Sequence, residues 1–216
     1  MILVVKENVI AIDGPAGSGK STIGCALAAR LDLDYLDTGA MYRAVAFAAL
    51  KAGADPNDEV AVSQIARNME LHLDSFTCVV DGADATSEIR GPEVTAAVSA
   101  VAALGNVRRE LVQRQRSWLD GRSGGVVEGR DIGSVVFPNA RLKLYLTASP
   151  KIRAQRRAGE MGEADLALVE ADIGRRDTAD RERPASPLVA ADGSVTLDTS
   201  NLTIPEVVEM IVRLLK

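Results

Sequence analysis

The sequence has 216 residues, of which 47% are hydrophobic and 25% are charged, and its formal net charge is −5. A chain of this length can bury one good core with a small appendage, and its acidity argues against a general nucleic-acid surface, which usually shows as a basic patch. No apolar run approaches the roughly 18 residues of a membrane span, and the N-terminus is too quickly charged for a signal peptide. We expect one main domain over residues 1–216, cytoplasmic and without membrane or nucleic-acid partners.

The first part of the sequence predicts a β-α-β-α order. Residues 9–13 form a short apolar run that stops at Gly14-Pro15, which is typical of a buried strand. Apolar residues then recur at helical spacing over 21–31. Residues 34–37 are a second short strand, and an alanine-rich helix from residue 40 ends at Gly53 as a cap.

The pattern of apolar and polar residues changes between about residues 69 and 93. Leu71-His72-Leu73 alternates, and an apolar run over 76–80 is followed by Asp81-Gly82, a hairpin turn signal. This pattern predicts a small β insertion. Helices are then expected over 94–101 and 107–118.

The remaining elements complete a sheet. Buried strands are predicted at 126–127, 142–146 and 195–197, and a last helix begins with Thr203-Ile204-Pro205-Glu206, which fits a capping box. Strands that alternate with helices imply a parallel sheet covered on both faces.

A phosphate-binding loop is predicted between the first strand and the first helix. Residues 14–21 match G-x-x-x-x-G-K-[ST] in the strand–loop–helix context that this motif requires. The glycines let backbone N–H groups turn toward a phosphate, and the helix N-terminus adds partial positive charge. Lys20 is expected to reach the β- and γ-phosphates, and the Ser21 hydroxyl to bind Mg²⁺. The ATP-binding residues expected here are Gly14, Pro15, Ala16, Gly17, Ser18, Gly19, Lys20, Ser21 and Thr22.

Arginine dominates the basic residues. Of 25 basic residues 19 are arginine, and 14 of these lie between Arg108 and Arg183. The guanidinium group grips phosphate with two parallel N–H donors, so this block indicates small phosphorylated ligands. The alternative for any one of them is a solvated helix face.

A P-loop also occurs in GTPase switches, motors and regulators. The sequence contains neither D-x-x-G nor N-K-x-D, so the usual guanine-nucleotide elements are missing. It is also too short for extra mechanical domains.

Further motifs follow in chain order and resemble those of bacterial cytidylate kinases. They are residues 36–43, 99–103, 107–110, 128–133 and 176–183, with Ser186-Pro187-Leu188 after the last. The resemblance implies an α/β P-loop NTPase fold of the adenylate-kinase kind, a parallel sheet flanked by helices. It also implies a small β-rich insertion at about 60–100 that binds the nucleoside monophosphate, and a short lid at about 153–170.

The same resemblance implies an enzyme that transfers the γ-phosphate of ATP to CMP or dCMP, with Mg²⁺ as cofactor and small molecules as partners. Carried over residue by residue, it places Arg43 and Arg130 on the 5′-phosphate of CMP. The other matches are Ser99, Arg109 and Asp131 on the cytosine, Arg176 and Asp180 on the sugar, Arg183 in closing the site, and Thr38 and Tyr42 in the acceptor pocket. Asp131 could instead orient Arg130.

Three arginines resemble those at the base of the family's lid. Arg153, Arg156 and Arg157 would bind ATP phosphates and neutralise charge during transfer. The segment 158–163 looks abbreviated, which leaves open which arginine contacts which phosphate. Lys20, Arg130 and Arg157 are the expected catalytic residues.

Several alternatives stay open. The acceptor phosphate is already ionised, so transfer needs no protein base, and the lone His72 is not expected to be catalytic. Glu128 could orient a metal-bound water or be a pocket-edge carboxylate. A related kinase acting on UMP, dTMP or shikimate, and a non-catalytic P-loop regulator, are the competing functions. A monomer is the default expectation.

Overall fold

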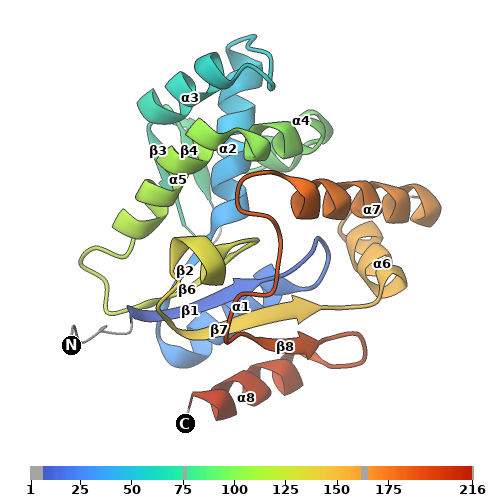
Figure 1. The fold of residues 1–216 in the computed structure, drawn as a ribbon. Coiled ribbons are helices and arrows are strands. Elements are labelled where there is room, and N and C mark those ends of the chain that lie inside the picture. Colours follow the sequence, from blue (N-terminus) through green and yellow to red (C-terminus); the bar gives the residue numbers. More distant parts are fainter. Residues whose placement is uncertain (1–6, 75–76, 162–164, 216) are drawn as a thin grey trace. The chain divides into compact units, whose positions relative to one another are not determined.

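The computed structural model describes residues 7–74, 77–161 and 165–215. The chain divides into two compact units (Figure 1). The first comprises Met1–Tyr35 and Ser123–Lys216, and the second comprises Leu36–Arg122.

The first unit is built on a parallel sheet. Its elements are β1 (Glu7–Asp13), α1 (Lys20–Leu31), β2 (Asp34–Asp37, at the junction of the units), β6 (Gly125–Gly129), the π-helical turn η2 (Ile132–Val136), β7 (Ala140–Thr147), α6 (Pro150–Met161), α7 (Leu166–Glu182), β8 (Val195–Asp198) and α8 (Ile204–Leu214). The strand order is β2-β6-β1-β7-β8. Strand β1 pairs in parallel with β6 and β7, and β7 pairs in parallel with β8. The loop that follows β1 therefore leaves from the middle of the sheet.

Helices α1 and α8 pack on this sheet. Ile10 and Ile12 of β1 are almost fully buried in one cluster with Leu27 of α1 and Ile211 of α8. Successive side chains of a strand point to opposite faces, so residues 10 and 12 mark one face, and α1 and α8 cover it. The apolar run at 9–13 is continuous because both faces of the central strand are buried.

The second unit combines helices with a small antiparallel sheet. Its elements are α2 (Thr38–Lys51), α3 (Glu59–Asn68), β3 (Leu71–Leu73), β4 (Cys78–Val80), β5 (Ala83–Asp84), the 3₁₀ turn η1 (Glu88–Arg90), α4 (Pro92–Ala103) and α5 (Gly105–Ser117). The sheet order is β3-β4-β5, and both pairs are antiparallel. Asp81 and Gly82 have φ angles of 51° and 76°, the positive values that a tight hairpin turn requires.

Most predicted elements are confirmed, including the turn at Asp81-Gly82 and the box that caps α8. Thr203 N donates to Glu206 Oε2 at 2.8 Å in that box. Helix α2 begins at Thr38 rather than at residue 40, because Asp37 caps it and accepts from Ala40 N at 3.0 Å. The predicted insertion at 60–100 falls inside the second unit, which is larger.

Three helices were not predicted. Helix α3 buries only Val62, Ser63 and Ala66, so its apolar stripe is thin, although Asp58 caps it by accepting from two backbone N–H groups. Helices α6 and α7 fall on the predicted lid, of which residues 162–164 lie outside the described residues. Within the part of the chain that the structure covers, every helix falls short of the length and apolarity needed to cross a bilayer.

Candidate active site

The loop after β1 has the geometry of a phosphate cradle. Gly14 has φ 152°, and a Cβ at this position would lie 2.1 Å from the carbonyl oxygen of Leu146, so only glycine fits. Gly19 caps α1 in the left-handed conformation (φ 86°) and has no side chain to cover the helix N-terminus. The first turn of α1 also lacks an acidic residue. The positive end of the helix dipole is thus available to an anion.

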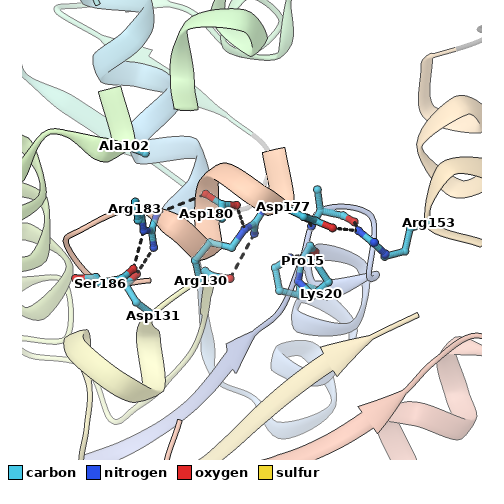
Figure 2. Close-up of polar contacts among 12 residues, drawn as sticks. Pro15, Lys20, Ala102, Arg130, Asp131, Arg153, Asp177, Asp180, Arg183 and Ser186 are labelled. Carbon is cyan, nitrogen blue, oxygen red and sulfur yellow. Dashed lines mark hydrogen bonds and ion pairs between the residues drawn. The ribbon is translucent and has the colours of Figure 1, made fainter. Parts of the chain in front are cut away.

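Polar side chains of the loop fit a phosphate group. The Ser18 hydroxyl is buried and has no hydrogen-bond partner among the residues described. Lys20 is 7% exposed, and its Nζ donates to the carbonyl of Pro15 at 2.8 Å, which folds the cation back over the loop (Figure 2). A buried hydroxyl without a partner is costly, and a phosphate oxygen can satisfy it.

A cavity of about 300 Å³ adjoins this loop. Its lining combines loop residues, the start of α1, Arg156 of α6 and a segment that runs from Thr199 into α8: Gly17, Ser18, Gly19, Thr22, Ile23, Arg156, Thr199, Leu202, Ile204 and Val207. The apolar members can face the flat surface of a nucleobase, while the polar members lie beside the loop. The sequence did not point to Thr199, Leu202, Ile204 or Val207, because these follow the last strand, about 180 positions after the loop.

The three predicted lid arginines have different surroundings. Arg156 donates to the carbonyl and the hydroxyl oxygen of Thr199, at 2.7 and 3.0 Å, and lines the cavity. Arg153 is buried and pairs with Asp177 at 2.5 Å. Arg157 is partly buried, and its charge acts on Arg176.

A second cluster of charges gathers around Asp180 on α7 (Figure 2). Arg130 Nε donates to Asp180 Oδ2 at 2.8 Å, and Arg183 Nη1 lies 3.6 Å from Asp180 Oδ1. Arg183 Nη2 lies 3.9 Å from Asp131 Oδ1. The structure therefore brings together Arg130, Asp131, Asp180 and Arg183. Asp131 lies beside Arg183, whereas the carboxylate that holds Arg130 is that of Asp180.

The pKa values of this cluster follow from its charges. Burial disfavours the Asp180 carboxylate, but the charge and hydrogen bond of Arg130, with the charges of Arg183 and Arg176, hold the pKa of Asp180 below its usual range. Burial and the like charge of Arg130, with that of Arg157, lower the pKa of Arg176. Asp172 and Asp180 oppose this lowering, so the like charges of Arg130 and Arg157 around Arg176 are only partly offset within the protein.

The other predicted acceptor residues belong to the second unit. Arg43 on α2 donates to the Thr95 hydroxyl at 2.9 Å and to the Ile89 carbonyl at 3.0 Å. Tyr42 is buried beneath the Arg108 guanidinium, 5.3 Å from the ring centre. Thr38 is buried at the start of α2, Ser99 is half-buried on α4, and Arg109 on α5 donates to Asn106. Arg108, which belongs to the motif at 107–110 but was assigned no contact there, is buried and donates to the Ala102 carbonyl at 3.0 Å.

Glu128 has a structural partner. This carboxylate ends β6, is almost fully buried, and accepts a hydrogen bond from the Tyr35 hydroxyl. The two alternatives for its function stay predictions.

A buried carboxylate holds the start of the loop. Asp13 ends β1, is 2% exposed, and accepts from the backbone N–H groups of Ile132 and Gly133 at 2.7 and 2.8 Å. Burial raises the pKa of Asp13 to about 6, with the charge of Asp131 adding to the rise while the two hydrogen bonds and Lys20 oppose it. The folded protein thus binds this proton more tightly than the unfolded chain, whose value is 3.8.

This difference predicts a dependence of stability on pH. The contribution of Asp13 is favourable at low pH and is lost as pH rises from 3.8 toward about 6. The unfolding free energy of the wild type minus that of Asp13→Asn should fall by roughly 2 kcal/mol between about pH 4.5 and 7.5. Urea unfolding of both proteins across this range measures the difference. Parallel curves would show that Asp13 does not titrate there.

Comparison with known proteins identifies the family. The profile of the family described as cytidylate kinase matches residues 10–216. The chain belongs to the cytidylate kinase family. It is 45% identical over 217 residues to the cytidylate kinase of Streptomyces avermitilis, covering 98% of this chain and 94% of that protein. The family resemblance of the sequence motifs is confirmed.

Some members of the cytidylate kinase family are longer. The chain is 46% identical over 224 residues to the bifunctional pantoate ligase/cytidylate kinase of Prochlorococcus marinus, covering 99% of this chain but 44% of that protein. It thus spans less than half the length of that relative.

The fold is that of P-loop kinases. A gluconokinase structure from Sinorhizobium meliloti superimposes with a TM-score of 0.50 at 15% identity, over 97% of this chain and 94% of that one. At this identity the likeness concerns the fold alone, and it agrees with the predicted α/β class.

Proposed function

We propose that the protein transfers the γ-phosphoryl group of ATP to CMP or dCMP, giving ADP and CDP or dCDP. The observation that carries this proposal is a second cluster of arginines, around Asp180, in the same unit as the phosphate loop. A kinase that transfers a phosphoryl group from one nucleotide to another needs cations beside the phosphates of both the donor and the acceptor. A P-loop sensor binds one nucleotide and needs no cations for a second phosphate. Membership of the cytidylate kinase family supports CMP as the acceptor.

The donor half is proposed to bind ATP. The loop, the Ser18 hydroxyl and Lys20 hold its phosphates, and the cavity of about 300 Å³ beside the loop takes its base. No group of three or more His, Cys, Asp or Glu side chains within the described ranges could hold a metal ion. The Ser21 hydroxyl, exposed at the start of α1, fits a Mg²⁺ that takes its other ligands from phosphates and water and would neutralise phosphate charge.

The acceptor half is proposed to bind CMP. Arg43 and Arg130 hold the 5′-phosphate, which is close to a dianion and needs fixed cations beside a triphosphate. Arg176 and Asp180 bind the sugar, Ser99, Arg109 and Asp131 read the cytosine, and Arg183 closes the site. An ionised phosphate oxygen is the nucleophile, so positioning and charge neutralisation by these arginines, Lys20 and Arg157 carry the catalysis.

A coupled assay of ADP release tests this function. CMP, dCMP, UMP, dTMP, AMP and shikimate are compared as acceptors, and we expect CMP and dCMP to give the highest kcat/KM. Turnover of another acceptor above CMP would replace the assignment, and slow ADP release independent of every acceptor would indicate an ATPase or a regulator.

Base recognition gives a sharper prediction. Cytosine presents an amino donor to Asp131 and an acceptor to Arg109, and uracil reverses both, leaving two unpaired groups that each cost about 1–3 kcal/mol. The wild type should therefore prefer CMP over UMP by at least about tenfold in kcat/KM. Asp131→Asn should lower this ratio, while the affinity for an ATP analogue stays unchanged. A constant ratio, with both acceptors weakened together, would show that Asp131 serves to orient Arg183.

A further inference from the structure

The phosphate loop is held at Ala16 by a buried ion pair. Asp177 of α7 is 2% exposed, and its Oδ1 accepts from Ala16 N at 3.2 Å. Its Oδ2 accepts from Arg153 Nη1 at 2.5 Å, and the same Nη1 donates to the carbonyl of Ala16 at 3.0 Å. Both backbone groups of Ala16 are thus bound by the two members of one pair.

The pair joins the loop to α6 and α7, whose contacting residues lie 137 and 161 positions after Ala16. Arg153 Nε donates to the carbonyl of Ala148, just after β7, at 3.1 Å. The Ala16 side chain packs in a buried cluster with Ala154 of α6 and Ile173 of α7. The loop is therefore fixed by polar contacts and by packing at the same residue.

The ion pair of Asp177 and Arg153 lies directly beside the phosphate-binding loop. A Cβ on Gly17 would come within 2.8 Å of the carbonyl oxygen of Arg153, so α6 already touches the loop one residue after Ala16. Ser18, with its buried hydroxyl, and Lys20 follow within four residues. A shift of the backbone at Ala16 would therefore displace the groups that face a phosphate, and small displacements of such donors are costly to binding.

A buried ion pair is weak evidence for a role in stability alone. Removing two charges from water costs about as much as their attraction returns, so apolar residues of similar volume often serve a fold equally well. The hydrogen bonds of this pair are directional: a carboxylate and a guanidinium can accept from Ala16 N, donate to Ala16 O and bind each other at the same time, which apolar residues cannot do.

We propose that Asp177 and Arg153 are positioning residues that set the phosphate loop at Ala16 for nucleotide binding, with Arg153 acting through the loop rather than on the phosphates of ATP. The pair also ties the loop to α7, which carries Asp180 three residues beyond Asp177. This inference rests on the proposed function only in that the loop binds a nucleotide phosphate.

The test separates loop geometry from stability with three variants: Arg153→Met, Asp177→Leu and the double variant. The thermal unfolding midpoint is measured for each protein. The ADP dissociation constant is then measured by isothermal titration calorimetry without acceptor, at a temperature well below that midpoint. Each single variant leaves one charge buried, so both properties should worsen. The double variant should regain most of the midpoint, yet still bind ADP at least about tenfold more weakly than wild type, because Ala16 has lost both partners.

Recovery of ADP affinity together with the midpoint in the double variant would overturn the proposal and make the pair purely structural. Should the double variant be unstable, Asp177→Asn gives a second comparison, because its amide oxygen can still accept from Ala16 N. It should bind ADP more tightly than Asp177→Leu, and equal affinities would contradict a positioning role of Asp177 at Ala16. Arg175→Met, which removes an exposed arginine of α7, is the control and should leave ADP affinity unchanged.

ADP binding needs no acceptor and no phosphoryl transfer. An inactive wild type in the acceptor assay would therefore disprove the proposed function while leaving this measurement intact.

Discussion

Replacing Lys20 by methionine should lower kcat for phosphoryl transfer at least about a hundredfold, because one preorganised cation at a site of developing charge is worth about 3 kcal/mol or more. Lys20 is 7% exposed, and methionine keeps the apolar part of its side chain. The hydrogen bond from its ammonium group to the Pro15 carbonyl lies within the loop and does not join the loop to another element. The fold should therefore survive. The unfolding midpoint and kcat with ATP and CMP are the two measurements.

The control for Lys20→Met is Lys151→Met, which removes an exposed lysine at the start of α6. It should leave kcat within about twofold, as expected for surface substitutions. A Lys20→Met protein with a normal midpoint and more than about a tenth of wild-type kcat would contradict a role of this cation in the transition state.

The loop and the sheet could be predicted because their signals are local. The run at 9–13, the glycine pattern at 14–21 and the helical spacing that follows define a strand, a turn and a helix within about twenty residues. The hairpin at Asp81-Gly82 and the capping box at Thr203 are equally local, since each depends on residues at most three positions apart.

The parts that escaped prediction depend on contacts between distant segments. Asp177 stands in a motif, but only the fold shows that it meets Ala16, 161 positions earlier. Likewise Thr199 is an ordinary residue after a strand until the fold brings it to the carbonyl of Ser18, at 3.2 Å from its hydroxyl. No spacing rule carries such information.

Arginines in a sequence show which chemistry is available but not which partner each arginine contacts. The motif resemblance grouped Arg153, Arg156 and Arg157 as ligands of ATP phosphates. In the structure Arg153 is 6% exposed and bound to Asp177, whereas Arg156 holds Thr199 at the edge of the cavity. Burial and partner choice, which follow from packing, distinguish these side chains.

Arg130→Met should lower kcat/KM for CMP at least about a hundredfold while leaving ADP affinity within about threefold. The proposed reason is loss of a cation from the 5′-phosphate of the acceptor. Arg181→Met, which removes an exposed arginine of α7, is the control and should change neither value.

The difficulty with this variant is that Arg130 also holds Asp180, so its loss leaves a largely buried carboxylate with fewer cations. A double-mutant cycle separates the two effects, because a residue that acts only through a second one has no effect once that second residue is neutral. Arg130→Met is therefore also introduced into Asp180→Asn. If Arg130 contacts the substrate phosphate, it should still lower kcat/KM for CMP by about a hundredfold on that background. If Arg130 serves only to neutralise Asp180, the second substitution will change little, and the acceptor phosphate must be bound by Arg43 without it.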